Sequence, residues 1–415
     1  MDIKFRKNIA ALLILQKANY ILPFVVIPYL TRTLGPDNFG KISFIQAVIN
    51  YFVLFTDFGF NMSATQHVAL SRNNIDELSK IFWTTTFSKM LLAIVSFFLL
   101  LCLILAIPEM RSSFFLYMIG FFVVLQSLFS PTWFFQGIEK TQWIIPISVI
   151  PRAVSILLVF VFIKTSNDFT AALFIQSFVC FIMTIIITVI FFLRKKLIKW
   201  YVPKIAEIKN ALDDGWHLFL STAAISLYTT SNTVLLGIIA NDKMVGYFVA
   251  ADKLIKGVQS LTFTIGQAAY PRMTIYAKES KEKALAFLKK CYKIMSISGL
   301  VCSIFLFLFA DILIRIVFGA QYLPSKALLQ IMSPAPFIVI LSYVFGILGL
   351  LPFGLKKTYS TIYIITGLAS IAFTIPLAFY YNMYGICVSV ILTEIFITIV
   401  TYSALKRNNI NLSLI

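Results

Sequence analysis

The sequence predicts an all-α polytopic membrane protein whose 12 transmembrane helices form two parallel-repeat six-helix bundles around a central cationic cavity. Three observations predict this fold class. Apolar residues make up 60% of the 415 residues and charged residues only 13%, against roughly 25% in an ordinary globular domain. The mean hydropathy is +0.90. Polar surface could not cover so apolar a chain in water, which excludes a cytosolic enzyme, a disordered chain and a disulfide scaffold.

The expected helices are stretches of about 20 largely apolar residues, the length that crosses the hydrocarbon core. In chain order they cover residues 8–30, 41–62, 82–106, 114–136, 144–165, 170–193, 215–239, 245–270, 294–317, 328–350, 359–380 and 384–405. The first is longer than the apolar region of a cleavable signal peptide, and no small-x-small cleavage site follows it. We therefore count it as a span.

The basic residues predict the orientation. The net charge is +18, from 35 Lys and Arg against 17 Asp and Glu. With the N-terminus inside, 23 of the 35 lie on the inner side and 6 on the outer side. Because short cytoplasmic loops carry the excess of Lys and Arg, both termini are expected in the cytoplasm. The positive charge then faces the inner membrane surface, and we expect no nucleic-acid partner.

The long basic segment 194–214 divides the spans into six and six, which predicts domains at 1–200 and 201–415. Two short similarities favour a duplication: GPDNFG at 35–40 with NDKMVG at 241–246, and FQGIEKT at 135–141 with PFGLKKT at 352–358. Each half has an even number of spans, so both halves point the same way. Parallel repeats of this kind are typical of alternating-access transporters.

The eighth span has the clearest polar face. A charge at the bilayer centre costs about 2.5–3.5 kcal/mol even on lenient scales of membrane insertion. Charged residues in a span are therefore expected to have a functional or structural role. Five polar residues recur at steps of 3, 4, 4 and 3, with Gln259 at the border: Lys253, Lys256, Ser260, Thr264 and Gln267. Asp252 can reach Lys256 at i,i+4. One acid cannot neutralise two lysines, so we expect this face to line a wet, cationic cavity.

Other polar residues are weaker candidates for the same cavity. Those expected to bind substrate are Lys17 in the first span, Asn50 in the second, Arg152 in the fifth, and Thr229 and Asn232 in the seventh. The alternative for the hydroxyls and amides is bonding to their own backbone or to neighbouring helices. Lys89 could snorkel to the surface, and Asp311 with Arg315 forms an i,i+4 pair that is expected to be structural.

Three acids are candidate ion-coupling sites: Asp57, Asp252 and Glu394. Glu394 has no obvious partner, so it could be protonated, pair across helices or carry a coupling proton. No cofactor is expected beyond a coupling H⁺ or Na⁺. The five cysteines have no paired spacing, so we expect neither a disulfide nor a metal site, and no catalytic residues.

Three stretches in the first third of the chain resemble a known family. They are PYLTRTLGPDNFG at residues 28–40, DFGF at 57–60 and WFFQGIEK at 133–140. They resemble the polysaccharide transport family, and within it the O-antigen flippases, of the multidrug/oligosaccharidyl-lipid/polysaccharide exporter (MOP) superfamily. Length and span number extend the resemblance over the whole chain.

The resemblance implies a function in lipopolysaccharide biosynthesis. Such proteins move an undecaprenyl-pyrophosphate-linked oligosaccharide from the cytoplasmic to the periplasmic leaflet of the bacterial inner membrane by alternating access, and the O-antigen polymerase and chain-length regulator are implied partners. The cationic lining proposed from spacing suits a pyrophosphate. An ion-coupled multidrug exporter of the same superfamily is one alternative. An integral-membrane glycosyltransferase or O-antigen polymerase is another, but the outer loops are short and no Asp-x-Asp motif occurs.

Overall fold

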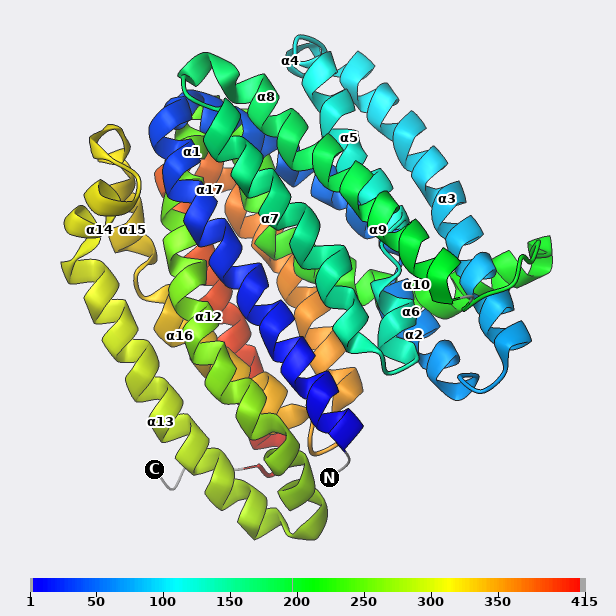
Figure 1. Cartoon of the computed structure of the whole chain (residues 1–415). Coiled ribbons are helices and arrows are strands. Elements are labelled where there is room, and N and C mark those ends of the chain that lie inside the picture. The colour runs from blue at the N-terminus through cyan, green and yellow to red at the C-terminus, as the bar shows by residue number, and fades with distance from the viewer. Residues whose placement is uncertain (1–2, 196, 411–415) are drawn as a thin grey trace. The chain divides into compact units, whose positions relative to one another are not determined.

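The computed structural model describes residues 3–195 and 197–410, with the side chains of residues 3–21, 193–195 and Leu261 left aside. The described chain is predominantly helical, and it contains no strand (Figure 1). It forms two compact units. Unit 1 consists of Met1–Leu34 and Ile45–Ala223, and unit 2 of Gly35–Phe44 and Ala224–Ile415.

The helices are those of a multi-pass membrane protein. Within the described residues, eight are long and apolar enough to cross a bilayer, or nine if the bent pair α10 (Ile205–Thr229) and α11 (Ser231–Ile239) is one span. α1 (Ile3–Asp57) breaks at Gly35, with φ 78°, and α17 (Lys356–Arg407) breaks at Asn382, with φ 49°. These breaks lie where the first two and the last two expected spans meet. The number twelve stays a prediction.

Unit 1 is built from helices that pack along their lengths, and Figure 1 shows α3, α5 and α9 side by side. α3 begins at Asn74, whose side chain accepts hydrogen bonds from the backbone N–H groups of Asp76 and Glu77 and so satisfies two groups that a helix start leaves unpaired. Unit 1 contains α1 apart from residues 35–44, and part of α10. Its other elements are α2 (Phe60–Leu70), α3 (Ile75–Ala106), α4 (Pro108–Arg111), α5 (Phe114–Leu128), α6 (Thr132–Gly137), η1 (Thr141–Trp143), α7 (Ile144–Phe162), η2 (Ser166–Asp168), α8 (Phe169–Phe174), the π-helical η3 (Ile175–Val179) and α9 (Cys180–Lys195).

An aromatic core explains two of the sequence stretches singled out above. Phe134 and Phe135 are fully buried and Trp133 is nearly so, and they pack with Phe82 and with the Phe58–Phe60 region. Within a bilayer such side chains stabilise the fold through van der Waals packing between helices rather than through transfer from water. Gly137 in the same stretch has no room for a side chain, because an added Cβ would lie 2.5 Å from a methyl carbon of Val68. These motif residues therefore determine packing within unit 1.

The segment that follows α9 is tied to α3. Trp83 Nε1 donates to the carbonyl of Lys199 at 2.9 Å, and the Lys199 N–H donates to Ser79 Oγ at 2.8 Å. The Tyr201 hydroxyl lies 2.9 Å from both carboxylate oxygens of Glu207 in α10, and this hydrogen bond raises the pKa of Tyr201. The first half of α10 is thereby held within unit 1.

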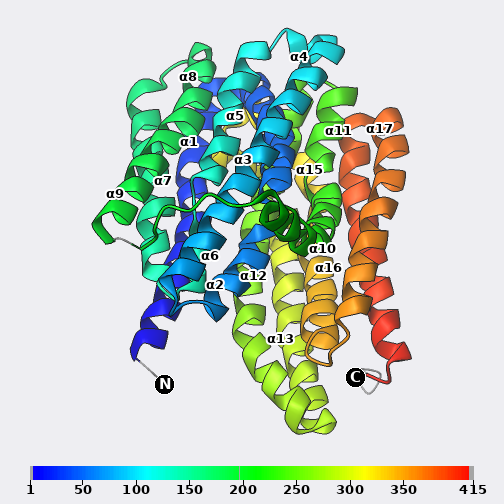
Figure 2. The ribbon, with the colours of Figure 1, turned by 90° about the vertical axis from the view of Figure 1, so that its right-hand side faces the viewer.

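Unit 2 contains a long helical hairpin, which Figures 1 and 2 show as α12 and α13 lying side by side. Ser280 joins the two helices and caps α13 by accepting from the Glu282 N–H. Besides α11, α17 and part of α10, the elements of unit 2 are α12 (Asp242–Glu279), α13 (Lys281–Leu308), α14 (Ala310–Val317), η4 (Ala320–Tyr322), α15 (Ser325–Met332), α16 (Ala335–Tyr343) and the π-helical η5 (Val344–Leu350).

Two turns that are similar in sequence contact each other inside unit 2. A Cβ added to Gly40 would lie 1.7 Å from the carbonyl oxygen of Asp242, and one added to Gly246 would lie 2.1 Å from the carbonyl oxygen of Pro36. The backbones of the two turns can approach each other this closely because Gly40 and Gly246 have no side chain. This reciprocal contact places residues 35–44 with the second half of the sequence.

The i,i+4 pair expected of Asp311 and Arg315 is confirmed. Arg315 Nε lies 2.8 Å from Asp311 Oδ2, and Lys326 Nζ lies 3.4 Å from Oδ1. The hydrogen bond from Arg315 lowers the pKa of Asp311. A carboxyl whose pKa is lowered by folding stabilises the fold above its unfolded pKa, and this stabilisation is lost as the pH falls through its folded pKa.

Asp311→Asn is therefore expected to lower thermal stability at neutral pH and to leave it unchanged at a pH where the wild-type carboxyl is protonated. Melting temperatures of the two purified proteins across that pH range measure the difference. A constant difference at every pH would contradict this role of the carboxylate.

Candidate functional site

An ion pair between a buried lysine and a half-buried aspartate joins three helices of unit 1. Lys89 Nζ on α3 lies 2.8 Å from Oδ1 of Asp57, at the end of α1, and donates to the carbonyl of Ser127 at 2.9 Å. Ser127 Oγ, near the end of α5, donates to the same carboxylate oxygen at 2.5 Å. Lys89 is only 1% exposed. Instead of snorkelling to the surface, this lysine is neutralised inside the protein.

The network accounts for the polar groups around Asp57. Its second oxygen, Oδ2, lies 3.4 Å from Nδ2 of Asn61. An apolar environment tolerates a charge only when the charge is paired and hydrogen-bonded, and both conditions are met for Lys89. Asp57, predicted as an ion-coupling site, therefore already has a cation as its partner. A coupling ion at this carboxylate would have to compete with Lys89.

The other predicted residues of unit 1 are not brought to this network. Asn50 is exposed on α1, and Arg152, which follows the buried Pro151 in α7, is exposed as well. Lys17 belongs to the part of α1 whose side chains lie outside the described residues. The roles assigned to these three residues stay predictions.

In unit 2 the polar face of α12 has the predicted i,i+4 pair. Lys256 Nζ lies 2.7 Å from Asp252 Oδ2, and its side chain remains 52% exposed while that of Asp252 is 18% exposed. Lys253 is also exposed, and Gln259 is half-buried. Two ammonium groups one turn apart thus remain accessible on one helix, an arrangement that can donate to an anionic ligand.

Glu394 has neighbours that the sequence did not reveal. It lies on α17, half-buried, and interacts electrostatically with Lys256 of α12. Two tyrosines of unit 2, Tyr228 and Tyr363, also interact electrostatically with its carboxylate. With Asp252, an ionised Glu394 balances the two lysines. The predicted excess of positive charge on this face therefore depends on whether Glu394 carries a proton.

Asn232 takes part in a buried polar chain rather than standing free. Thr374 Oγ1 lies 3.4 Å from Asn232 Oδ1 and 3.1 Å from Ser389 Oγ, and Asn232 Nδ2 donates to the carbonyl of Tyr228. Thr229 is exposed, and its hydroxyl donates to the Ile225 carbonyl at 3.0 Å. Both side chains thus form hydrogen bonds to the backbone of their own helix, which is the alternative to substrate binding for polar groups in spans.

The polar groups of these clusters can form hydrogen bonds and ion pairs with a polar ligand. Across the described part of the chain, no three His, Cys, Asp or Glu side chains gather as they would around a metal ion. Ser127 and Tyr363 could not be found from the sequence, because a hydroxyl in a transmembrane helix carries no signal of its partner on another helix. The clusters combine paired charges with hydroxyls and amides.

Comparisons with known sequences give a family match. Residues 5–277 match the model of a family described as "Polysaccharide biosynthesis protein". A protein of Escherichia coli (strain K12) is 35% identical over 410 residues, which cover 98% of each chain. A protein of Shigella dysenteriae is 33% identical over 407 residues, covering 97% of this chain and 100% of that one. Both carry the name "Putative O-antigen transporter".

Solved structures share the fold at low sequence identity. A lipid II flippase, MurJ, in an inward closed conformation has a TM-score of 0.72 at 15% identity, covering 95% of this chain and 87% of that one. An inward-facing multidrug resistance transporter of the MATE family, in the MOP superfamily, has a TM-score of 0.68 at 14% identity, covering 93% and 96%. These similarities concern the arrangement of the helices.

Proposed function

Because the chain belongs to the polysaccharide biosynthesis protein family, we propose that it is a flippase for a lipid-linked O-antigen oligosaccharide. The observation that carries this proposal is the 35% identity over 98% of both chains with a relative named as an O-antigen transporter. The substrate would be an oligosaccharide linked to undecaprenyl pyrophosphate, moved from the cytoplasmic to the periplasmic leaflet. The names of the relatives agree with a transporter and not with an enzyme.

The exposed lysines of α12 suit this cargo. A pyrophosphate diester is strongly solvated, and burying it without partners is very costly. Ammonium groups replace the lost water through charge-assisted hydrogen bonds. Lys253 and Lys256 are exposed within a helix that is expected to span the bilayer. We assign them the pyrophosphate, and we assign the amides and hydroxyls at Asn50, Thr229 and Gln259, together with Arg152 and Lys17, to the head group.

The finer architecture belongs to the proposal as well. Twelve spans follow if α1 and α17 are each counted as two at their breaks and α12 is added despite its charges. Two six-helix repeats, both termini in the cytoplasm and an inner-membrane location complete it. An alternating-access cycle would then expose the lysines to each side in turn, and the polymerase and chain-length regulator would act on the delivered cargo.

Flipping is tested directly in vesicles. The purified protein is reconstituted with fluorescent undecaprenyl-pyrophosphate-linked oligosaccharide, and the fraction accessible to an external quencher is followed over time. We expect exchange between leaflets with the protein and none with protein-free vesicles. Absence of exchange, together with normal surface polysaccharide after gene deletion in a strain that lacks a second exporter, would refute the proposal.

Lys253→Gln combined with Lys256→Gln is expected to reduce the flipping rate by tenfold or more. A hydrogen bond to a charged group contributes about 1.5–3 kcal/mol, and tenfold corresponds to about 1.4 kcal/mol. The matched control is Lys278→Gln with Lys281→Gln, which removes two exposed lysines from the end of the same hairpin. Equal rates in the two double variants would exclude Lys253 and Lys256 from substrate binding.

Ion coupling by H⁺ or Na⁺ is proposed for Glu394 and Asp252 ahead of Asp57. Lys89 already neutralises Asp57. A single proton on Glu394, by contrast, changes the net charge of the group that it forms with Asp252 and the two lysines of α12. Glu394→Gln is expected to retain passive exchange of cargo and to lose acceleration by an imposed ion gradient. Acceleration equal to that of the wild type would remove Glu394 from coupling.

An ion-coupled multidrug exporter remains the second candidate, since a MATE transporter shares the fold. Full-length relatives named for O-antigen transport favour the polysaccharide cargo. A membrane glycosyltransferase or O-antigen polymerase has no support from either comparison. Drug-resistance assays in cells that express the protein separate the first alternative from flipping.

A further inference from the structure

The segment that leads from α9 into α10, residues 197–205, exposes a cluster of large apolar side chains. Trp200 is 69% exposed, Val202 65% and Ile205 87%. None of them belongs to a stretch expected to cross the bilayer, since those stretches end at residue 193 and resume at 215. Figure 2 shows the segment passing over α3 between α9 and α10. An exposed apolar cluster marks a contact with another protein or with a membrane.

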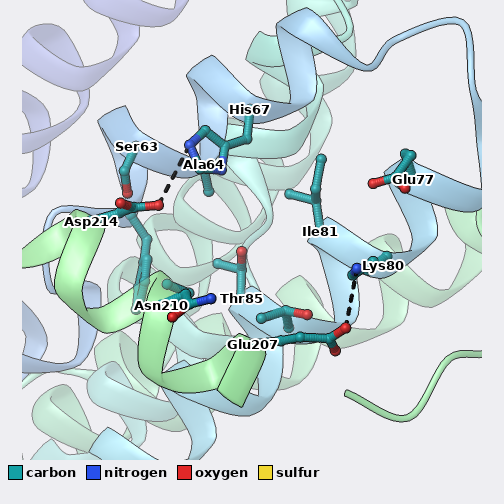
Figure 3. Close-up of a pocket in the computed structure, with 13 residues that line it drawn as sticks. Ser63, Ala64, His67, Glu77, Lys80, Ile81, Thr85, Glu207, Asn210 and Asp214 are labelled. Carbon is teal, nitrogen blue, oxygen red and sulfur yellow. Dashed lines mark ion pairs between the residues drawn. The ribbon is translucent and has the colours of Figure 1, made fainter. Parts of the chain in front are cut away.

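The backbone that carries these side chains is fixed to α3 and α10. Besides the two hydrogen bonds of the Lys199 backbone described above, the Lys204 N–H donates to Glu207 Oε2 at 2.9 Å. Lys80 Nζ of α3 lies 3.1 Å from the other oxygen of that carboxylate. Figure 3 shows Lys80 and Glu207 pointing toward one another from the two helices. The apolar side chains therefore extend outward from an ordered part of unit 1.

The contacts on α3 place this segment at the level of the lipid headgroups. The Lys199 backbone bonds to Ser79, and its side chain pairs with Asp76 at 2.7 Å. These two residues precede residue 82, where the third span is expected to begin, by three and six positions. At 1.5 Å per residue they lie about 4.5–9 Å outside the hydrocarbon core. The headgroup layer on each side of a bilayer is about 5–7 Å thick.

The exposed cluster continues the lipid-facing side of α3. Trp200 packs on Trp83, with ring centroids 4.3 Å apart. From there one helical face of α3 is apolar, and it comprises Trp83, Phe87, Met90, Ile94 and Phe98. The last three are at least half exposed, on a helix long and apolar enough to cross the membrane. Tryptophan is enriched where such helices meet the headgroups. This continuity selects the bilayer as the partner of the cluster.

The charges beside the cluster suit a lipid phosphate. Lys204 and Lys209 are exposed, and neither forms an ion pair with a residue of the described chain. Asp213 and Asp214 follow one turn after Lys209 and are exposed as well, so the region has no large excess of positive charge. An ammonium group can donate to the phosphate that zwitterionic and anionic phospholipids share. The surface thus fits phospholipid headgroups in general.

We propose that residues 197–205 are an interfacial anchor that lies among the phospholipid headgroups of the bilayer. Trp200, Val202 and Ile205 insert between the headgroups, and Lys204 bonds to a lipid phosphate. The anchor holds the first half of α10, and with it unit 1, at one depth in the membrane. It does not depend on which cargo the protein moves.

The experiment compares one added tryptophan at two exposed sites. Ile205→Trp tests the anchor. Leu70→Trp is the matched control, because Leu70 is 80% exposed and lies eight residues after the second expected span and twelve before the third. The full-length variants are placed in phospholipid nanodiscs, with or without lipids that carry bromine on the acyl chain close to the headgroup, and the wild-type emission is subtracted. We expect brominated lipid to remove more than half of the emission added by Ile205→Trp and iodide in the solvent to quench it little. Leu70→Trp should show the reverse.

Each outcome decides the matter. If iodide quenches Ile205→Trp as strongly as Leu70→Trp, the segment faces water and the anchor is refuted. Insensitivity of Ile205→Trp to both quenchers would mean that protein covers the segment, for example a second copy of the chain, and this also refutes it. Val202→Trp provides a second reading at a site that is exposed in the same way, and it must give the pattern expected of Ile205→Trp.

Discussion

Lys89→Ala is expected to destabilise the protein by less than the roughly 3–5 kcal/mol that breaking a fully buried ion pair costs, because the remaining Asp57 side chain is 24% exposed. The remaining partner, Asp57, would keep a carboxylate for which the described residues supply Ser127 and Asn61 as hydrogen-bond donors. Unfolding of the purified protein in mixed detergent micelles with increasing dodecyl sulfate measures the loss.

Two variants identify the origin of that loss. Lys89→Met with Asp57→Leu removes both charges, and we expect it to recover most of the stability, because replacing a buried ion pair by apolar residues is often neutral or stabilising. Lys199→Ala breaks an exposed ion pair with Asp76, whose side chains are 62% and 73% exposed, and should cost less than about 1 kcal/mol. Equal losses for Lys89→Ala and Lys199→Ala would show that burial does not govern the pair.

Gly40→Ala is expected to destabilise unit 2 by about 1–3 kcal/mol, the usual cost of forcing extra volume into a packed site. Its Cβ would lie 1.7 Å from the carbonyl oxygen of Asp242, which is backbone and cannot rotate away. The same unfolding measurement applies, and proteolysis near residues 35–44 would report the separated turn.

The reciprocal variant tests whether one contact is involved. Gly246→Ala meets the carbonyl of Pro36 at 2.1 Å and should show a similar loss, and the double variant should lose less than the sum, since neighbouring substitutions share one interaction. Gly346→Ala is the control, because its nearest atom is a ring carbon of Tyr359 at 3.2 Å that can move. Additive losses at Gly40 and Gly246 would mean that the two turns are independent.

Features that depend on spacing along the chain could be predicted from the sequence. The Asp252–Lys256 and Asp311–Arg315 pairs are fixed by the four-residue step of a helix, and both form. The breaks of α1 at Gly35 and of α17 at Asn382 lie between apolar stretches. Helical periodicity and apolar length carry this information locally.

Partners on different helices could not be predicted. The 31 residues between Asp57 and Lys89 contain no pattern that sets the 2.8 Å distance between the two charged groups. Glu394 interacts with Lys256 only because α17 and α12 belong to one unit. The placement of residues 35–44 in unit 2 was likewise not visible, since the boundary expected near residue 200 rested on counting spans. Tertiary packing determines such contacts, and a single sequence does not record it.

The division into units bears on how the protein is made. Residues 35–44 leave the ribosome early, yet the backbone that Gly40 contacts, at Asp242, is synthesised about 200 residues later. The first half of the protein can therefore fold during translation only with this turn unpartnered. A fragment that stops at residue 200 would also lack the part of α10 that packs on Gly59, where an added Cβ would lie 2.7 Å from Leu218. Nascent chains stalled before α12 should accordingly depend on the insertion machinery for protection until unit 2 arrives.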